Sequence, residues 1–190
     1  DYSLAEYSSL EQSVEKATVD GYTAALSGGG FSKPAGWYLI DFPEENDLTL
    51  PQIIDGVTDY TVADYLFYCE NITSVTLPET VAGIGECAFF GCGVLSEVNI
   101  SDKAPLREIK RATFYGCASL KSFAMPVITE KIGDEAFFGC RQLKTVEFCN
   151  NLTDIDDYAF YGCDVLEEIN IPNVSAVTVG AGAFKGCSSV

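Results

Sequence analysis

The sequence predicts an α/β solenoid, a right-handed stack of about six coils, each with one concave strand and one short helical turn, preceded by an N-terminal cap. A cysteine recurs at nearly constant spacing, a Phe stands three residues before five of the six, and apolar residues recur after each one. The recurring cysteines are Cys69, Cys92, Cys117, Cys140, Cys163 and Cys187. A period of roughly 23 residues is typical of stacked repeats and not of a single globular core.

The strand of each coil is expected after the cysteine. Cys140, for example, is followed by Leu143, Val146 and Phe148. The last two alternate with polar residues, which is the period of a strand with one buried face. A proline follows several of these strands, where its missing N–H ends the ladder: Pro51, Pro78, Pro126 and Pro172.

The segment before each cysteine is expected to form the helical turn. Residues 133–137, Gly-Asp-Glu-Ala-Phe, lie between the apolar Ile132 and the Gly139-Cys140 pair. A single coil cannot bury its apolar side alone, so the neighbouring coils must cover it.

Residues 132–140, Ile-Gly-Asp-Glu-Ala-Phe-Phe-Gly-Cys, resemble the unit of the BspA-like leucine-rich repeat family. The resemblance covers about residues 48–190 and recurs in tandem. It implies a secreted or cell-surface protein, typical of bacteria of the mouth and gut. It also implies binding or adhesion to a host or matrix protein or glycan, without catalysis. The family supplies no fixed binding residues.

The N-terminal segment, residues 1–47, is expected to cap the solenoid of residues 48–190. Residues 3–6, Ser-Leu-Ala-Glu, resemble a capping box, so a helix is expected over about 4–18 and a strand over about 37–42. The sixth coil stops at Val190, which suggests truncation, with an anchoring or catalytic domain beyond it. End-to-end self-association through this uncapped coil and a purely structural spacer are the alternatives.

Composition excludes several classes of function. The formal net charge of −17 argues against nucleic acid and anionic membrane surfaces. No apolar run approaches the ~18 to 20 residues of a membrane span, so no membrane insertion is expected. The chain contains no histidine, which removes His-based catalysis and His metal ligands. Neither a cofactor nor a metal is expected, and the chain is not expected to be an enzyme.

The recurring cysteines are expected to stack inward as free thiols, because buried Cys packs as a small apolar residue. Cys87 and Cys149 break the register. Cys87 is expected to be exposed, and no bond between these two is expected because they lie two coils apart.

Two of three candidate binding surfaces are polar. The outward positions of the strands carry small polar and acidic residues: Glu97, Asn99, Thr145, Glu147, Glu168 and Asn170. The irregular coil 101–111 holds two extra residues and a basic cluster: Lys103, Arg107, Lys110 and Arg111. The strand face and this loop are the surfaces through which a partner, either protein or glycan, is expected to be bound.

The third candidate is an aromatic row two residues before each cysteine: Phe67, Phe90, Tyr115, Phe138 and Tyr161, followed by Lys185. The residues one position earlier are expected to fill the core. At one coil's spacing the rings of the row would stack in a stripe. An exposed stripe would form a groove for a sugar or protein, whereas a half-buried one would serve packing.

Overall fold

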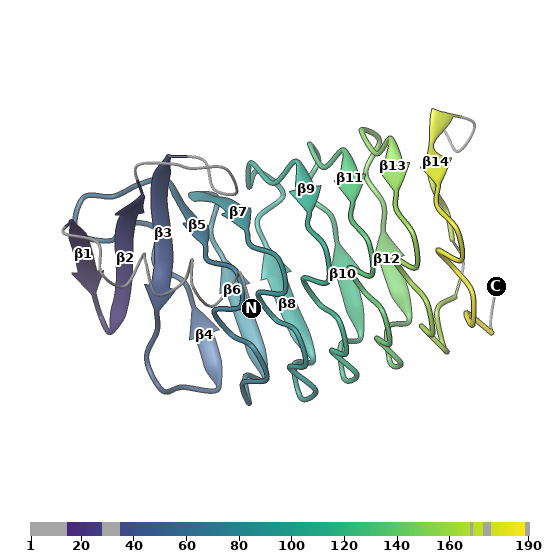
Figure 1. Ribbon diagram of the computed structural model, residues 1–190, viewed down its shortest axis with the longest axis horizontal. Coiled ribbons are helices and arrows are strands. Elements are labelled where there is room, and N and C mark those ends of the chain that lie inside the picture. Colours follow the sequence, from purple (N-terminus) through teal and green to yellow (C-terminus); the bar gives the residue numbers. More distant parts are fainter. Residues whose placement is uncertain (1–14, 28–34, 168, 173–175, 189–190) are drawn as a thin grey trace.

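The computed structural model describes residues 15–27, 35–167, 169–172 and 176–188, and Figure 1 shows them as a solenoid of stacked coils. The described residues contain no α-helix. Each regular coil has two short strands and a run of turns. The first strands of successive coils are β4 (Asp47–Thr49), β6 (Ser74–Leu77), β8 (Glu97–Ile100), β10 (Ser122–Ala124) and β12 (Thr145–Glu147). The second strands are β5 (Tyr60–Val62), β7 (Val81–Ile84), β9 (Glu108–Ile109), β11 (Lys131–Ile132), β13 (Asp154–Ile155) and β14 (Thr178–Val179).

Equivalent strands of neighbouring coils pair in parallel, one coil apart, as Val75 with Val98 and Ile132 with Ile155. Both rows of strands are interrupted at the coil that contains β8 and β9, the first row on its far side and the second row on its near side. The first row divides into β4-β6-β8 and β10-β12, and the second divides between β7 and β9. This is the position of the irregular coil with its two extra residues. The insertion shifts the strands, and the turns carry the backbone contacts there, as in the bond from the Phe89 N–H to the Thr113 oxygen (2.9 Å).

The N-terminal part of the described chain is a β-meander that continues the second row. β1 (Lys16–Val19) and β2 (Tyr22–Ser27) form an antiparallel hairpin, β3 (Gly36–Asp41) pairs with β2, and β3 then pairs in parallel with β5. The strand predicted over 37–42 is confirmed.

The helix predicted over 4–18 is wrong at its C-terminal end, where Lys16–Val19 is a strand. Burial of Ala17 between the exposed Lys16 and Thr18 has the period of a strand, which the spacing of apolar residues did not distinguish. The remaining positions of that predicted helix, 4–14, lie outside the described residues.

The predicted helical turn is also wrong, and the coil containing Cys140 shows why. Glu135 and Gly139 have left-handed backbone conformations, with φ of 56° and 69°, which no α-helix can contain. The N–H groups of Glu135, Phe137 and Gly139 donate to carbonyl oxygens of the next coil at 3.0, 2.7 and 2.8 Å. The intervening N–H groups donate three residues back along the chain. The segment is therefore a series of turns whose alternate amides join it to the next coil.

Two columns of side chains fill the core beneath these turns. The first is a stack of Phe rings with centroids 4.8 to 5.3 Å apart: Phe67, Phe89, Phe114, Phe137, Phe160 and Phe184. The second is the thiol column, defined as Cys92, Cys117, Cys140, Cys163 and Cys187, all of them buried and free. Each thiol lies against the carbonyl oxygen of a Phe in the preceding coil, as Cys117 Sγ does against the Phe89 oxygen at 3.2 Å. Inward stacking as free thiols is confirmed for these five.

Cys69 does not belong to the thiol column. It is exposed and has a φ of 57°, and it occupies the position held by Gly91 in the next coil. Val75 follows Phe67 by eight positions, whereas Val98 follows the equivalent Phe89 by nine. The turn residues of the first coil are therefore shifted by one position relative to those of the later coils, although the spacing from Cys69 to Cys92 is regular.

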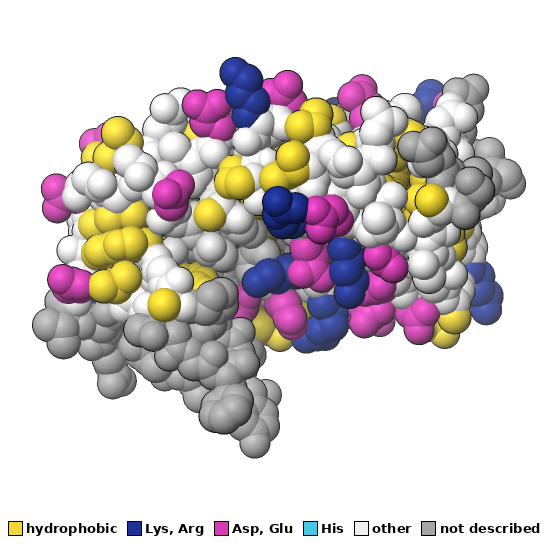
Figure 2. Space-filling view, turned by 90° about the horizontal axis from the view of Figure 1, so that it is seen from above, with side chains coloured by type: hydrophobic (Ala, Val, Ile, Leu, Met, Phe, Trp, Pro, Cys, Tyr) yellow, Lys and Arg dark blue, Asp and Glu magenta, His cyan; other side chains and the backbone are white. Residues whose placement is uncertain are grey.

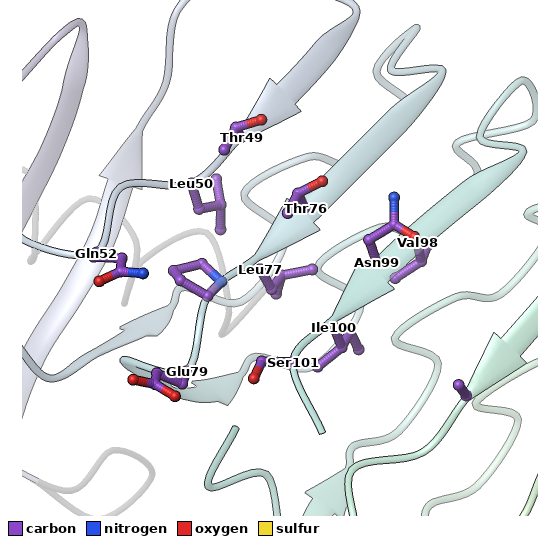
Figure 3. A pocket seen from close by; sticks show the side chains of 12 residues that line it. Thr49, Leu50, Gln52, Thr76, Leu77, Glu79, Val98, Asn99, Ile100 and Ser101 are labelled. Carbon is purple, nitrogen blue, oxygen red and sulfur yellow. The ribbon is translucent and has the colours of Figure 1, made fainter. Parts of the chain in front are cut away.

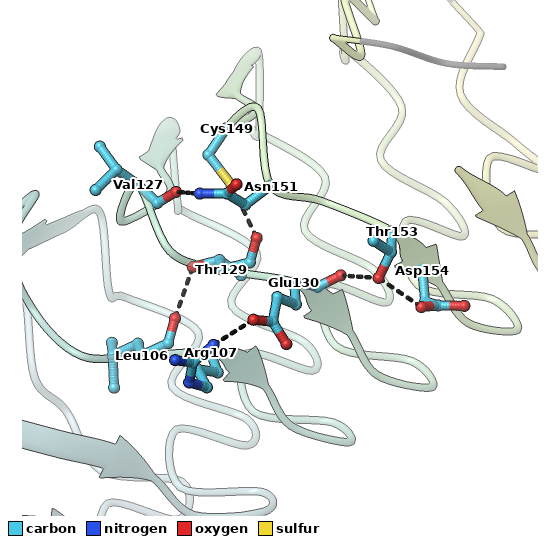
Figure 4. Close-up of polar contacts among 9 residues, drawn as sticks. All are labelled: Leu106, Arg107, Val127, Thr129, Glu130, Cys149, Asn151, Thr153 and Asp154. Carbon is cyan, nitrogen blue, oxygen red and sulfur yellow. Dashed lines mark hydrogen bonds and ion pairs between the residues drawn. The ribbon is translucent and has the colours of Figure 1, made fainter. Parts of the chain in front are cut away.

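Cys87 and Cys149 are less accessible than Cys69. The predicted exposure of Cys87 is wrong, because this residue is buried at a left-handed turn position with a φ of 53°. Burial also raises the pKa of its thiol. Cys149 is half-buried, and its Sγ donates to the Thr129 carbonyl oxygen at 3.0 Å (Figure 4).

Alkylation of the native protein at neutral pH is expected to modify Cys69 much faster than the other seven cysteines. Accessibility of the thiol limits such reactions, and the other side chains are buried or half-buried. Mass spectrometry after brief treatment with iodoacetamide would show one dominant adduct, absent from a Cys69→Ser variant. A dominant adduct on Cys87 would contradict the burial described above.

Candidate functional site

The outward face of the first strands is polar and exposed, as expected. Glu97, Asn99, Thr145 and Glu147 are exposed there. Asn170 is exposed but belongs to no described strand, and Glu168 lies outside the described residues. The Asn99 Nδ2 donates to Glu97 Oε1 at 2.7 Å. The structure thus places the predicted residues of β8 and β12 on one face.

A hollow of about 540 Å³ opens where β4, β6 and β8 end (Figure 3). Of the predicted residues of the strand face, Asn99 lines it. Thr76 of the strand face also lines it. Other residues of its walls and floor were not predicted as site residues: Thr49, Leu50, Gln52, Leu77, Glu79 and Ser101, among others.

Two of the four cations of the basic cluster, Arg107 and Arg111, form ion pairs with acids of adjacent coils. Arg107 forms an ion pair with Glu130 of the next coil, and the Arg111 Nη2 lies 3.2 Å from Glu86 Oε2 of the preceding coil. Figure 2 shows such Lys and Arg side chains interleaved with Asp and Glu. Exposed pairs like these contribute little to stability, but they neutralise the field that would attract an anionic partner.

Hydrogen bonds also hold the irregular coil against its neighbour. The Thr129 hydroxyl, fully buried, donates to the Leu106 carbonyl oxygen at 2.8 Å (Figure 4). Lys103 is exposed on the same loop and Lys110 is half-buried. The four predicted cations therefore lie in one region but do not form a uniform basic surface.

The aromatic row forms a continuous stack on the turn side of the solenoid. We define the aromatic stripe as Tyr68, Phe90, Tyr115, Phe138 and Tyr161, whose successive centroids lie 5.1, 4.5, 4.7 and 4.8 Å apart with interplanar angles of 2° to 10°. Its first member is Tyr68 and not the predicted Phe67, which is fully buried in the core because of the shift of one position. Tyr68 is 47% exposed, and the other four rings are half-buried.

The rings of the stripe present their edges to solvent. Parallel rings less than about 5.5 Å apart cover each other's faces, so the partial exposure of the inner rings, Phe90, Tyr115 and Phe138, comes from their edges. Tyr65 and Tyr158 lie beside the stripe, with centroids 6.0 Å from Tyr68 and 5.9 Å from Tyr161. The aromatic surface is therefore wider than one ring at each end.

Within the part of the chain that the structure describes, no group of three or more Cys, Asp or Glu residues is placed to hold a metal ion. A helix long and apolar enough to cross a membrane is likewise absent from the described ranges. Among the described carboxyls, the one whose pKa is clearly lowered is Asp47, which accepts hydrogen bonds from the hydroxyls of Thr73 and Ser74.

Comparisons with solved structures find bacterial repeat proteins of the same fold. A leucine-rich repeat protein of T. pallidum is 26% identical with a TM-score of 0.65, over 93% of this chain and 91% of its own. A leucine-rich cell surface protein of Faecalibacterium prausnitzii is 24% identical with a TM-score of 0.63, over 95% of this chain and 54% of its own. The pneumococcal vaccine antigen PcpA is 21% identical with a TM-score of 0.72, over 92% of this chain and 48% of its own.

The chain thus spans about half the length of the F. prausnitzii and pneumococcal proteins. No curated protein matches it. The model of the BspA type leucine-rich repeat region matches residues 60–190 in six copies. Together with the two strand rows and the stacked Phe and Cys columns, this match shows that the chain belongs to the BspA-type leucine-rich repeat family.

Proposed function

We propose that this chain is a protein-binding module of a bacterial surface protein and that it holds its partner against the aromatic stripe. The observation that carries the proposal is the continuous row of stacked rings across five coils. Packing of ring on ring half-buries four of them, but their edges stay accessible, so packing within the row and contact with a partner are compatible. Aromatic side chains dominate the energetics of protein interfaces, where Tyr is among the commonest residues of binding hot spots. The F. prausnitzii relative, described as a cell surface protein, supports an extracellular location.

The geometry favours a protein over a glycan as the partner. Sugars bind aromatic residues by stacking on ring faces, and both faces of the three inner rings, Phe90, Tyr115 and Phe138, are covered by stacked neighbours. Ring edges instead suit apolar side chains and edge-to-face contact with the rings of a partner. The phenols of Tyr115 and Tyr161 add hydrogen-bonding groups at regular intervals along the apolar row.

The stripe also serves this role better than the surfaces first expected. Arg107 and Arg111 are already paired with acids of adjacent coils. The strand face offers small polar and acidic residues, which are depleted at the centres of protein interfaces. The function proposed for this chain is therefore binding of a partner protein, without catalysis.

The test compares two double variants on panels of immobilised matrix proteins and glycans. Tyr115→Ser with Tyr161→Ser removes two rings of the stripe, and Thr145→Ala with Glu147→Ala alters the strand face to a similar extent. We expect binding to one or more proteins, weakened by about tenfold or more in the stripe variant and by less than about twofold in the strand variant.

Circular dichroism confirms that both variants are folded before binding is measured. Absence of protein binding at ~100 μM, binding to glycans alone, or equal losses in the two variants would overturn the proposal.

A further inference from the structure

We infer that a second binding site lies at the junction of the cap and the first coils, and that it accepts an extended peptide segment carrying Lys or Arg. The hollow of about 540 Å³ at the ends of β4, β6 and β8 adjoins a second hollow of about 410 Å³ beside the cap. Thr49, Leu50 and Gln52 line both. We call the two together the junction trough.

The charge of the junction trough selects the ligand. Its described lining contains four carboxylates and neither Lys nor Arg: Asp20, Glu45, Asp47 and Glu79. Asp20 lies between β1 and β2, Glu45 lies between β3 and β4, Asp47 begins β4 and Glu79 follows β6, so the acids are distributed along the trough. Clefts lined by one sign of charge concentrate ligands of the opposite sign.

One of these carboxylates is fixed in place. The Ser74 hydroxyl donates to Asp47 Oδ1 at 2.9 Å, and the Thr73 hydroxyl donates to the same oxygen. These bonds hold the pKa of Asp47 below its ordinary value of 3.8, so it stays ionised at neutral pH. Because Asp47 is exposed, a lysine ammonium or arginine guanidinium of a ligand could contact its carboxylate.

The remaining lining suits an extended backbone. The half-buried Pro78 and Ile100 give the floor its accessible apolar surface, and the buried Leu50 and Leu77 lie beneath it. Thr76, Asn99 and Ser101 place hydroxyl and amide groups above it (Figure 3). An extended peptide can direct alternate side chains toward the apolar floor and the carboxylates while its backbone bonds to the rim.

Other ligand classes fit the junction trough poorly. Phosphate groups would be repelled by the four carboxylates. A sugar would find no ring face to stack on, because the one aromatic residue in the described lining, Tyr22, is only 6% exposed. The junction trough shares no residue with the aromatic stripe, so this inference stands apart from the proposed function.

The test uses a defined probe, a fluorescein-labelled ten-residue peptide of alternating Lys and Thr, and the matching Glu-Thr peptide. Fluorescence anisotropy is measured at 0.15 M salt, where the Debye length is about 8 Å and distant charges are screened. We expect the Lys-Thr peptide to bind, and the Glu-Thr peptide to show no binding.

Two double variants of equal net charge distinguish binding in the junction trough from nonspecific attraction of the peptide to the acidic chain. Glu45→Gln with Glu79→Gln neutralises two acids of the trough, and Glu70→Gln with Asp164→Asn neutralises two exposed acids elsewhere. The first variant is expected to weaken binding about tenfold and the second less than about twofold. Thr76→Trp, which fills the hollow without changing the charge, is expected to abolish binding.

Equal weakening by the two charge variants would show diffuse electrostatics and overturn the inference. It would also be overturned by full binding in Thr76→Trp or by no binding at ~1 mM peptide. The stripe variant, Tyr115→Ser with Tyr161→Ser, should bind the peptide normally, so failure of either proposal can be recognised without the other.

Discussion

Raising the pH above about 9 is expected to destabilise this protein progressively and to unfold it near pH 10 to 12, because the thiol column must stay protonated in the folded state. Burial raises the pKa of Cys92 to about 12 from an ordinary value of 9.0. Burial, and secondly the neighbouring thiols of the column, hold the pKa values of Cys117, Cys140 and Cys163 well above that value too. A thiolate in this column would lie beside a carbonyl oxygen with no proton to donate.

The direction of the pH effect follows from proton binding. Below pH 9 both the folded and the unfolded chain carry thiols, and the free energy of unfolding is unaffected. Above it the unfolded chain releases protons that the folded chain retains, so unfolding becomes easier as the pH rises. Each such thiol lowers the free energy of unfolding by about 1.4 kcal/mol per pH unit, and four lower it by about 5 to 6.

Against a typical total of about 5 to 15 kcal/mol, this slope places the unfolding midpoint near pH 10 to 12. Buried Tyr60, whose pKa burial also raises, acts in the same direction at the upper end. Urea denaturation at pH 8, 9 and 10, followed by circular dichroism with a reductant present, would measure the slope.

A Cys117→Ala, Cys140→Ala double variant provides the control. It removes two of the linked protons, each of which contributes about 1.4 kcal/mol per pH unit, so the slope should fall by about 3 kcal/mol per pH unit even though the cavities lower the stability at pH 8. An unchanged slope would mean that other groups cause the alkaline loss.

The repeat itself could be read from the sequence, because the apolar and cysteine spacing repeats at the coil period. The shift at Cys69 could not be read from that spacing, since the gap from Cys69 to Cys92 is as long as the gap from Cys117 to Cys140. One signal was available: Tyr68-Cys69 lacks the Gly that precedes every other recurring cysteine. The shift decides whether Phe67 or Tyr68 begins the aromatic stripe.

The pairing of the basic cluster was also accessible in principle. Arg107 and Glu130 stand one coil period apart in the sequence, and so do Glu86 and Arg111, so each pair occupies adjacent coils. Residues one coil period apart lie in adjacent coils of a solenoid, so an acid at that spacing can pair with a base and neutralise its charge.

No pattern in the sequence predicts the degree of exposure of the stripe or the existence of the junction trough. The prediction that the earlier ring of each pair fills the core is confirmed for Phe89, Phe114, Phe137 and Phe160. The exposure of the later ring depends on left-handed turn residues such as Glu135, which have no characteristic residue type. The trough combines residues of the cap with those of the first coils, and no repeat relates the two.

Replacing Gly85 with alanine is expected to destabilise the protein severely, because two coils meet at its Cα. An added Cβ would lie 2.4 Å from the backbone nitrogen of Asp64 and 2.6 Å from the Ala63 carbonyl carbon. These atoms belong to the backbone and cannot rotate away, so the coils must separate. Separation would strain the 2.8 Å bond from the Gly85 N–H to the Val62 oxygen. We expect a loss of about 3 kcal/mol or more in the free energy of unfolding.

Gly93→Ala and Gly139→Ala separate this contact from the general effects of removing a glycine. At Gly93 the nearest other atom to an added Cβ is 3.9 Å away, so the change should be neutral or stabilising by up to about 1 kcal/mol. Gly139 has open space but a φ of 69°, so backbone strain alone should cost about 1 to 2 kcal/mol. Thermal and urea unfolding of the three variants should therefore rank them Gly93, Gly139, Gly85 in increasing damage. If Gly85→Ala were no worse than Gly139→Ala, close approach of the coils could not be the reason for glycine at position 85.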